Sequence, residues 1–311
     1  MLSACNFYMP IFEEALDAYG LPLELRYLPI IESALNPSAV SRAGASGLWQ
    51  FMIGTGKIYG LESNSLVDER RDPIKATWAA ARYLKEMYDI YGDWNLVIAA
   101  YNCGPGTINK AIRRANGETD YWKIYNYLPK ETRGYVPAFI AANYVMTYYC
   151  DHNICPMETN IPASTDTVQV NKNLHFEQIA DLCNVPLDQI KSLNPQYKKQ
   201  MIPGDSKPYT LRLPIDAIST FIDKQDTIYT HRADELFRNR KTVAVKDITP
   251  ATRKTTSAVA GKGNLTYYTI KSGDTLSTIA GKYGVSVKDI QRWNGMSNTK
   301  IAAGKRLKIY K

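Results

Sequence analysis

The second half of this 311-residue chain contains an internal repeat, which limits the fold more than any other feature. Matching residues recur at a constant offset of 100 positions, which indicates one small unit present twice. Each copy reads as an extended segment, two short helices and a second extended segment. We therefore expect two β-α-α-β modules, each with its two strands paired. The matching residues are Ile179, Ala180, Val185, Ile190, Asn194 and Gly204, followed by Ile279, Ala280, Val285, Ile290, Asn294 and Gly304.

The first half has helical spacing of apolar residues and no alternation typical of a strand. Asp72 and Asp93 are residue types that cap helices, and Pro73 suits a first helical turn. We expect helices over 7–19, from Pro22 with a kink at Pro29, from about Leu48, from Pro73 to about Tyr91, over 94–102, from Pro105, and over 133–150.

Together the halves predict a multidomain α+β protein. We place an all-α domain at 1–160, a first module at 165–215 and a second module at 264–311. Between the modules we expect a partly helical linker over 216–263, because Thr, Ala, Lys and Gly dominate its last part.

Charge is distributed unevenly. Residues 1–160 carry 14 Lys and Arg against 17 Asp and Glu, whereas the remaining residues carry 24 against 13. A basic second half suits nucleic acid, a membrane surface or an anionic cell-wall polymer. Its basic residues are spread along small modules without a stacked aromatic set, so we do not expect nucleic-acid binding.

Several function classes are excluded by missing patterns. The sequence has no phosphate-binding loop motif and no dinucleotide fingerprint, so nucleotide chemistry is not expected. Its three histidines lie far apart, so we expect no metal site and no cofactor. No apolar run is long enough for a transmembrane helix.

Five cysteines leave two questions open. Cys150 and Cys155 are near enough in sequence to form a disulfide if the backbone turns, but free thiols are also common and are the favoured alternative. Residues Leu2 to Cys5 have the form of a lipoprotein cleavage site. Such a site needs a basic and an apolar stretch before it, so we interpret the match as coincidence or as the remnant of a longer start.

Glu32 is the candidate catalytic acid. It follows an apolar helical segment, and an apolar pocket raises the pKa of a carboxyl group. Alone it would be read as a surface or ion-paired residue. Its significance comes from three further segments, which contain Gly44 to Phe51, Ala99 to Gly106 and Glu131 to Val136.

These four segments, in this order and spacing, resemble the lytic transglycosylase, or goose-lysozyme-like, catalytic domain, and most of all the membrane-bound lytic murein transglycosylases of the D type. The resemblance covers residues 7–150. It implies cleavage of the β-1,4 bond between N-acetylmuramic acid and N-acetylglucosamine in peptidoglycan. It also implies that Glu32 acts alone, first as acid on the glycosidic oxygen and then as base on the C6 hydroxyl, which closes a 1,6-anhydro ring without water.

The resemblance gives further residues a role. Tyr101 is expected to lie near Glu32, and either to orient it or to stabilise the transition state through its hydroxyl. The expected substrate-binding residues are Ser33, Ser46, Trp49, Gln50, Asn102 and Tyr135. Trp49 and Tyr135 would offer flat faces to sugar rings. Structural roles stay open for several of them: Ser33 ending a helix, Ser46 supporting a turn, Trp49 in the core and Asn102 as a helix cap. Arg133 is expected to be a structural ion-pair partner rather than a ligand.

The repeated units resemble LysM modules, which bind glycans containing N-acetylglucosamine. In the second copy the expected glycan-binding residues are Gly273, Asp274, Thr275, Leu276 and Asn294. The first copy has Asn173, Leu174, His175 and Phe176 in place of the Gly-Asp-Thr-Leu element, so it is expected to be degenerate and its glycan binding is left open.

Two rival functions stay open. A hydrolytic lysozyme on the same fold would need a second carboxylate, for which Asp68, Glu69 and Asp72 are candidates. A non-catalytic protein would only bind peptidoglycan. For the preferred function we expect peptidoglycan strands as the partner, a monomer, and a place in the cell envelope, in the periplasm or at the periplasmic side of the outer membrane. Lipid anchoring at Cys5 is left open.

Overall fold

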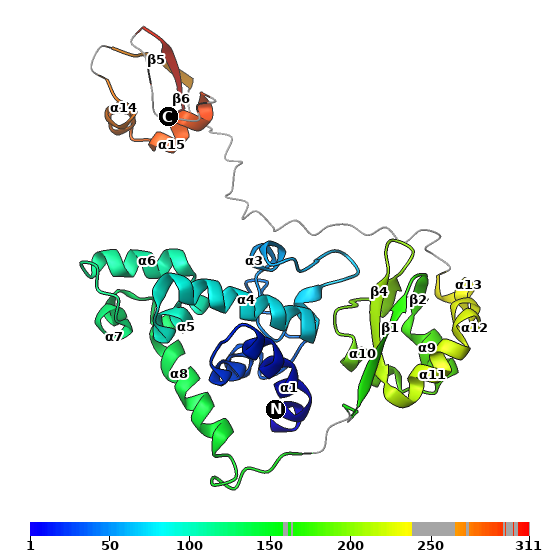
Figure 1. Ribbon diagram of the computed structural model, residues 1–311. Helices are drawn as coiled ribbons and strands as arrows, with labels where there is room; N and C mark the ends of the chain where they lie inside the picture. The colour runs from blue at the N-terminus through cyan, green and yellow to red at the C-terminus, as the bar shows by residue number, and fades with distance from the viewer. Residues whose placement is uncertain are drawn as a thin grey trace. The chain divides into compact units, whose positions relative to one another are not determined.

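The computed structural model describes residues 1–157, 161–162, 164–237, 265–271, 274–294, 296, 301 and 304–310. The chain divides into two compact units, Met1–Pro250 and Ala251–Lys311, and each is considered by itself (Figure 1). Within the described residues, no helix is both long and apolar enough to cross a membrane.

The first unit begins with a helical domain. Helix α1 (Leu2–Ala18) packs on α4 (Pro73–Tyr91), α4 packs on α5 (Trp94–Cys103), and α5 packs on α8 (Lys130–Thr147). Shorter helices complete the domain (Figure 1). They are η1 (Leu23–Tyr27), α2 (Leu28–Ser33), α3 (Ile53–Ile58), η2 (Glu69–Arg71), α6 (Pro105–Arg114), α7 (Tyr121–Ile124) and η3 (Tyr125–Tyr127), where η marks a 3-10 helix.

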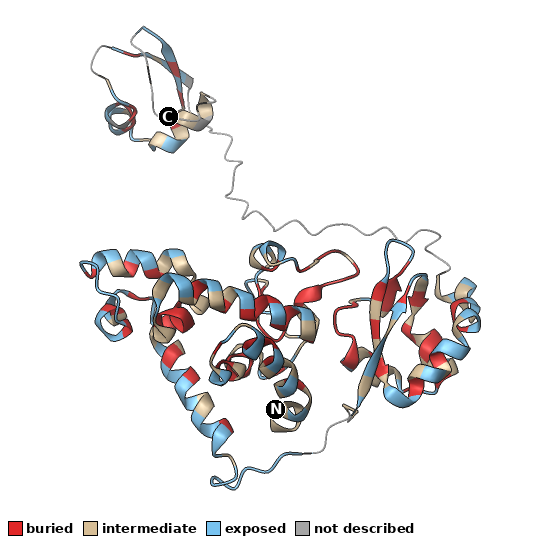
Figure 2. Ribbon diagram, viewed as in Figure 1, coloured by how far each residue is buried: buried red, intermediate tan, exposed pale blue. Residues whose placement is uncertain are grey.

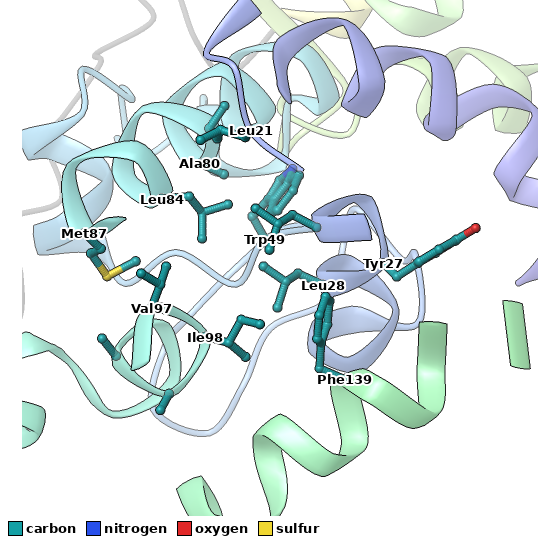
Figure 3. Packing of buried hydrophobic residues seen from close by; sticks show 14 of the residues in the cluster. Leu21, Tyr27, Leu28, Trp49, Ala80, Leu84, Met87, Val97, Ile98 and Phe139 are labelled. Carbon is teal, nitrogen blue, oxygen red and sulfur yellow. The ribbon is translucent and has the colours of Figure 1, made fainter. Parts of the chain in front are cut away.

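The core of this domain surrounds Trp49, whose ring is fully buried. Figure 3 shows Trp49 between Leu84 and Ala80 of α4 and Leu28 of α2. Its indole Nε1 donates a hydrogen bond of 2.9 Å to Thr77 Oγ1 on α4. A buried indole needs such a partner, because an unpaired buried donor is costly. The core thus joins α2, which carries Glu32, to the long helices.

The expected helices at 73–91 and 94–102 are confirmed, and Asp72 and Asp93 cap them as expected. The chain changes from the 3-10 helix η1 to α2 between Tyr27 and Leu28, so Pro29 lies in the first turn of α2. The expected helix from Leu48 is wrong. Turns occupy residues 47–50 and α3 begins only at Ile53. Gly47 and Gln50 have φ values of +89° and +48°, which a right-handed helix does not allow.

The first module follows in the same unit. Strand β1 (Thr165–Val170) pairs antiparallel with β4 (Tyr209–Pro214), and α9 (Phe176–Cys183) and α10 (Leu187–Leu193) lie between them in sequence. Alternate residues of β4 are buried, so one face of this strand covers the core (Figure 2). A second pair, β2 (Asn173–His175) with β3 (Met201–Pro203), was not expected.

Three helices extend this module: α11 (Ile215–Asp223), α12 (Gln225–Thr230) and α13 (Ala233–Leu236). Helices α11 and α12 pack on α9, and Phe221 and Ile228 are fully buried in the module core. The beginning of the expected linker is therefore part of the module. The rest of that linker, residues 238–263, lies outside the described residues.

The second unit is the smaller module. Strand β5 (Leu265–Thr269) pairs antiparallel with β6 (Arg306–Tyr310), and α14 (Leu276–Tyr283) and α15 (Val287–Trp293) lie between them in sequence. Ile290 is fully buried here, as Ile190 is in the first module, so the repeated residues fill equivalent core positions. The expected multidomain α+β class, with a helical domain followed by β-α-α-β modules, is confirmed.

Candidate active site

Glu32 lies at the end of α2, which packs against α8 and η1. The helix stops there because Ala34 and Leu35 have left-handed backbone conformations, with φ of +51° and +60°. Ser33 Oγ donates to the carbonyls of Pro29 (3.0 Å) and Leu48 (2.9 Å). Ser33 therefore ties the end of α2 to the loop that contains Trp49.

Burial raises the pKa of Glu32 from its ordinary value to about 7. Two neighbours on α8 modify this effect in opposite directions. The Tyr135 hydroxyl donates a hydrogen bond to Glu32 Oε1, which lowers the pKa, and the negative charge of Glu131 raises it. A carboxyl group with a pKa near 7 exchanges a proton readily at neutral pH, as a general acid and base must.

In the structure Tyr135, rather than Tyr101, makes the hydrogen bond to Glu32. Tyr101 was expected to orient Glu32 or to stabilise the transition state, and the ring of Tyr135 was expected to face a sugar. The hydrogen bond to Glu32 comes from Tyr135, whose own pKa is held far above 10 by burial and by Glu32, so it stays a donor. The Tyr101 hydroxyl instead donates a hydrogen bond of 2.6 Å to the Trp49 carbonyl. Tyr101 is still close enough to Glu32 for the charge of Glu32 to help raise the Tyr101 pKa, after the larger effect of burial.

The loop from Gly44 to Phe51, here called the acid-side loop, positions the other expected ligands. Ser46 is fully buried, and its Oγ accepts a hydrogen bond from Arg71 Nε at 3.1 Å. Trp49 is also fully buried. Gln50 Nε2 donates to the carbonyls of Gly47 (2.9 Å) and Ala39 (3.2 Å). Ser46 and Trp49 are thus structural here, and no face of the Trp49 ring is free to stack on a sugar.

Asn102 and Arg133 also make hydrogen bonds to other residues of the helical domain. Asn102 Oδ1 accepts a hydrogen bond of 2.8 Å from Thr132 Oγ1 on α8. Asn102 does not cap α6, because that helix begins after Gly104. Arg133 donates to the carbonyls of Leu128 (3.0 Å) and Asn126 (3.1 Å). These bonds fit a structural role, but they go to backbone carbonyls and not to the carboxylate that was expected.

The three carboxylates considered as a second catalytic group are all engaged elsewhere. Asp68 forms a bidentate ion pair with Arg70, in which Nε donates to Oδ1 at 2.9 Å and Nη2 donates to Oδ2 at 2.8 Å. Glu69 pairs with Lys75 and accepts the Glu62 backbone N–H at 2.8 Å. Asp72 Oδ1 accepts the backbone N–H groups of residues 74 and 75 and so caps α4.

Expected glycan-binding residues of the second module mostly build the module itself. Asp274 Oδ2 accepts from the Lys271 N–H and the Tyr268 hydroxyl, both at 2.8 Å, and these bonds lower the pKa of Asp274. Thr275 caps α14, and Leu276 is buried in the core. Gly273 lies outside the described residues.

Asn294 is structural as well. Its amide donates to the carbonyls of Ile290 (2.8 Å) and Lys308 (2.9 Å), and its Oδ1 accepts the Lys308 N–H at 2.7 Å. Asn194 makes the same three kinds of bond in the first module. The repeated asparagine therefore fastens the second helix of each module to its last strand.

All five cysteines are free thiols, and Cys150 and Cys155 are exposed and not bridged. Within the parts of the chain that the structure describes, no three His, Cys, Asp or Glu side chains are arranged to hold a metal ion.

Comparison with protein families matches three regions. Residues 9–124 match the transglycosylase SLT domain, residues 164–230 match the LysM-like domain of lytic transglycosylase MltD, and residues 268–309 match the LysM domain. With Glu32 in a half-buried site of the first region, these domains define the class: the chain belongs to the lytic murein transglycosylase family.

Individual relatives include a membrane-bound lytic transglycosylase of the D type, the type that the sequence motifs resemble. The membrane-bound lytic murein transglycosylase D of Escherichia coli K12 is 33% identical over 294 residues, which cover 93% of this chain and 60% of that protein. The chain therefore spans less than two thirds of this relative. The soluble lytic murein transglycosylase of the same organism is 33% identical over 124 residues, 38% of this chain and 19% of that protein.

Two further matches cover smaller parts of the chain. The autolysin of Enterococcus faecalis is 55% identical over 49 residues, 16% of this chain and 7% of that protein. The crystal structure of the 70 kDa soluble lytic transglycosylase of Escherichia coli matches with 29% identity and a TM-score of 0.40, over 46% of this chain and 24% of that one.

Proposed function

We propose that this chain is a peptidoglycan lytic transglycosylase with Glu32 as its single acid and base. The observation that carries the proposal is the environment of Glu32. Burial raises its pKa to about 7, and the Tyr135 hydroxyl donates to its carboxylate. The substrate is the β-1,4 bond between N-acetylmuramic acid and N-acetylglucosamine, the bond named by the family resemblance.

The reaction has two proton transfers through the same carboxyl group. Protonated Glu32 gives its proton to the glycosidic oxygen, and the bond from that oxygen to C1 breaks. Glu32, now a carboxylate, takes the proton from the C6 hydroxyl of the same muramic acid. The C6 oxygen bonds to C1 and closes the 1,6-anhydro ring, so water is not consumed and Glu32 ends protonated again.

The other candidate carboxylates already make structural ion pairs or cap a helix, which supports a mechanism with a single catalytic acid. Asp68, Glu69 and Asp72 each have a structural partner. Freeing Asp68 would also leave the buried Arg70 guanidinium without its ion pair. Glu131 is the carboxylate whose charge acts on Glu32, and it is exposed in the first turn of α8. A hydrolytic lysozyme on this fold would need a carboxylate such as Glu131 as its base.

The second module is proposed to hold the enzyme on its insoluble substrate, because tethering raises the local concentration of cleavable bonds. The match to the LysM domain supports this role. The membrane-bound relative supports a place in the cell envelope. Periplasmic exposure and a monomeric state belong to the same proposal.

Substitution Glu32→Gln tests the proposal. We expect the release of soluble fragments from purified peptidoglycan to fall by about 10²–10⁴-fold, the usual contribution of a general acid and base. Pelleting with the polymer should not change, because the amide keeps the shape of the side chain. If Glu32→Gln releases fragments at the wild-type rate, Glu32 is not the catalytic acid. If neither protein releases fragments and both pellet, the chain is a binding protein.

A further inference from the structure

A loop of the helical domain enters the core of the first module. Leu66 and Val67 are buried there together with Phe176 and Tyr197 of the module. Val67 and Tyr197 form an antiparallel bridge. We call residues 61–72 the bridging loop. Two residues from the helical domain, Leu66 and Val67, are therefore part of the apolar core of the module.

Backbone hydrogen bonds fix the same contact. The Asp68 N–H donates to the Gln196 carbonyl, and the Lys198 N–H donates to the Leu66 carbonyl, both at 2.9 Å. At the start of the loop, the Glu62 carboxylate accepts a hydrogen bond of 3.0 Å from the Tyr209 hydroxyl. It also forms an ion pair of 2.7 Å with Lys207. Strand-like pairing together with side-chain contacts holds the loop at several points, so its shape depends on the module.

The other end of the bridging loop holds the acid-side loop. Arg70, paired with Asp68 and almost fully buried, donates from Nη1 to the carbonyls of Gly44 and Phe51, both at 2.8 Å. These are the two ends of the acid-side loop. Between them, a Cβ on Gly47 would lie only 1.7 Å from the Arg70 carbonyl oxygen, so the two backbones touch.

From the acid-side loop, two hydrogen bonds lead to the catalytic centre. The Leu48 carbonyl accepts from Ser33, the residue after Glu32, at 2.9 Å. The Trp49 carbonyl accepts from Tyr101 at 2.6 Å. Continuous packed contacts therefore run from the first module through Arg70 to the end of α2.

We propose that the first module is a fixed part of the catalytic body, which positions the acid-side loop beside Glu32 through the bridging loop and Arg70. Arg70 is thus a positioning residue, since it acts through backbone carbonyls of the acid-side loop. The module supports the rate of the bond-breaking step, and it does so without touching the glycan. The kinetic part of this inference rests on the proposed function, whereas the structural part does not.

The first test compares two identical truncations in the core of the first module. Val67→Ala deletes two methyl groups where the bridging loop enters the core, and Val185→Ala deletes two from the α9–α10 turn. In full-length Val67→Ala we expect amide hydrogen exchange of residues 44–51 to become faster and kcat to fall about 10-fold, with KM and pelleting within twofold. In Val185→Ala, exchange of residues 44–51 and kcat should match the wild type.

Arg70→Lys is the second test. Lysine keeps the positive charge but cannot hold the Asp68 carboxylate and two carbonyls together. We expect faster exchange of residues 44–51 and a kcat reduced about 10-fold, at unchanged KM. Circular dichroism and thermal unfolding show whether each variant is folded, and residues 44–51 are compared with amides of α4, which report global opening.

Three results overturn the inference: unchanged exchange of residues 44–51 in both Val67→Ala and Arg70→Lys, equal effects of Val67→Ala and Val185→Ala, or a change in KM or pelleting with kcat unchanged. A wild-type protein that yields no 1,6-anhydro product would instead refute the proposed function. In that case the exchange data would still decide whether the module holds the acid-side loop.

Discussion

At the scale of single residues, the site is controlled by the surroundings of one carboxyl group. Burial is the largest influence on the pKa of Glu32, and Tyr135 and Glu131 act on it with opposite signs. Both neighbours are on α8, one turn apart, so they are presented to Glu32 by a single rigid element. Each can therefore be removed with a nearly isosteric substitution, Tyr135→Phe or Glu131→Gln.

These two substitutions should shift the pH dependence of kcat/KM in opposite directions. The acid must be protonated to start the reaction, so activity falls as pH rises through the pKa of Glu32, about 7. Tyr135→Phe removes a hydrogen bond that favours the carboxylate, so the falling limb moves to higher pH. Glu131→Gln removes a repelling charge, so the limb moves to lower pH. Shifts in the same direction would contradict this assignment.

Glu131→Gln also separates the two mechanisms. If Glu131 is only a nearby charge, the variant keeps most of its activity at pH 6. If it is the base of a hydrolase, activity falls by about 10²–10⁴-fold at every pH.

The raised pKa of Glu32 should make the free energy of unfolding depend on pH. Between its ordinary value of 4.5 and about 7, the folded protein binds a proton at Glu32 more tightly than the unfolded chain does. The free energy of unfolding contributed by this group therefore decreases as pH rises through that window, by about 3 kcal/mol in total. Glu32→Gln lacks this loss, so its stability relative to the wild type should increase from pH 4.5 to 8 in urea unfolding. A pH-independent difference between the two proteins would refute the raised pKa.

The sequence selected residues that meet at this site, but it did not predict which of them form hydrogen bonds with each other. Glu32, Tyr101 and Tyr135 were all selected from the sequence, because their motifs have a characteristic order and spacing. Which tyrosine reaches Glu32 depends on how α5 and α8 are rotated against α2, and helical periodicity does not fix that rotation. Trp49 was predicted as a ligand, with a core position left open, and a local pattern could not decide between these.

At the scale of elements, the acid-side loop depends on backbone shapes that few residues adopt. Gly44 and Gly47 have φ values of +87° and +89°, which favour glycine. Their surroundings differ. No atom lies within 4 Å of a Cβ built on Gly44, whereas a Cβ on Gly47 would overlap the Arg70 carbonyl.

This difference predicts unequal costs for two similar substitutions. Gly44→Ala meets only backbone strain and should lower the free energy of unfolding by about 1–2 kcal/mol. Gly47→Ala must also push the acid-side loop away from Arg70, and should cost about 3–5 kcal/mol. Urea unfolding of both variants measures the difference. Equal costs would mean that the two loops are not in contact.

Helices with clear end signals were predicted well, and the acid-side loop was not. Asp72 followed by Pro73 caps α4, and Asp93 caps α5, so those helices begin where local chemistry places them. The turns at 47–50 arise from contacts with Arg70 and Tyr101, which are distant in sequence. Local apolar spacing around Leu48 therefore predicted a helix where tertiary contacts impose turns.

At the scale of the whole molecule, the repeat predicted two modules, and the structure distinguishes their surroundings. The first module shares its core with Leu66 and Val67 of the helical domain and with α11 and α12. The described core of the second module is built from residues of that module alone. The sequence predicted the duplicated unit because its core residues recur at a fixed offset. It did not reveal the shared core, because Leu66 and Val67 look like ordinary loop residues.

The central claim is that Glu32 breaks the glycosidic bond without water, and one measurement tests it most directly. Purified peptidoglycan is digested by the full chain in water enriched in oxygen-18, and the soluble fragments are identified by mass spectrometry. The account predicts fragments ending in 1,6-anhydro-N-acetylmuramic acid, lighter than hydrolysis products by one water and free of the label. Reducing-end fragments that contain oxygen-18 would show that water is the nucleophile and would contradict the single-residue mechanism.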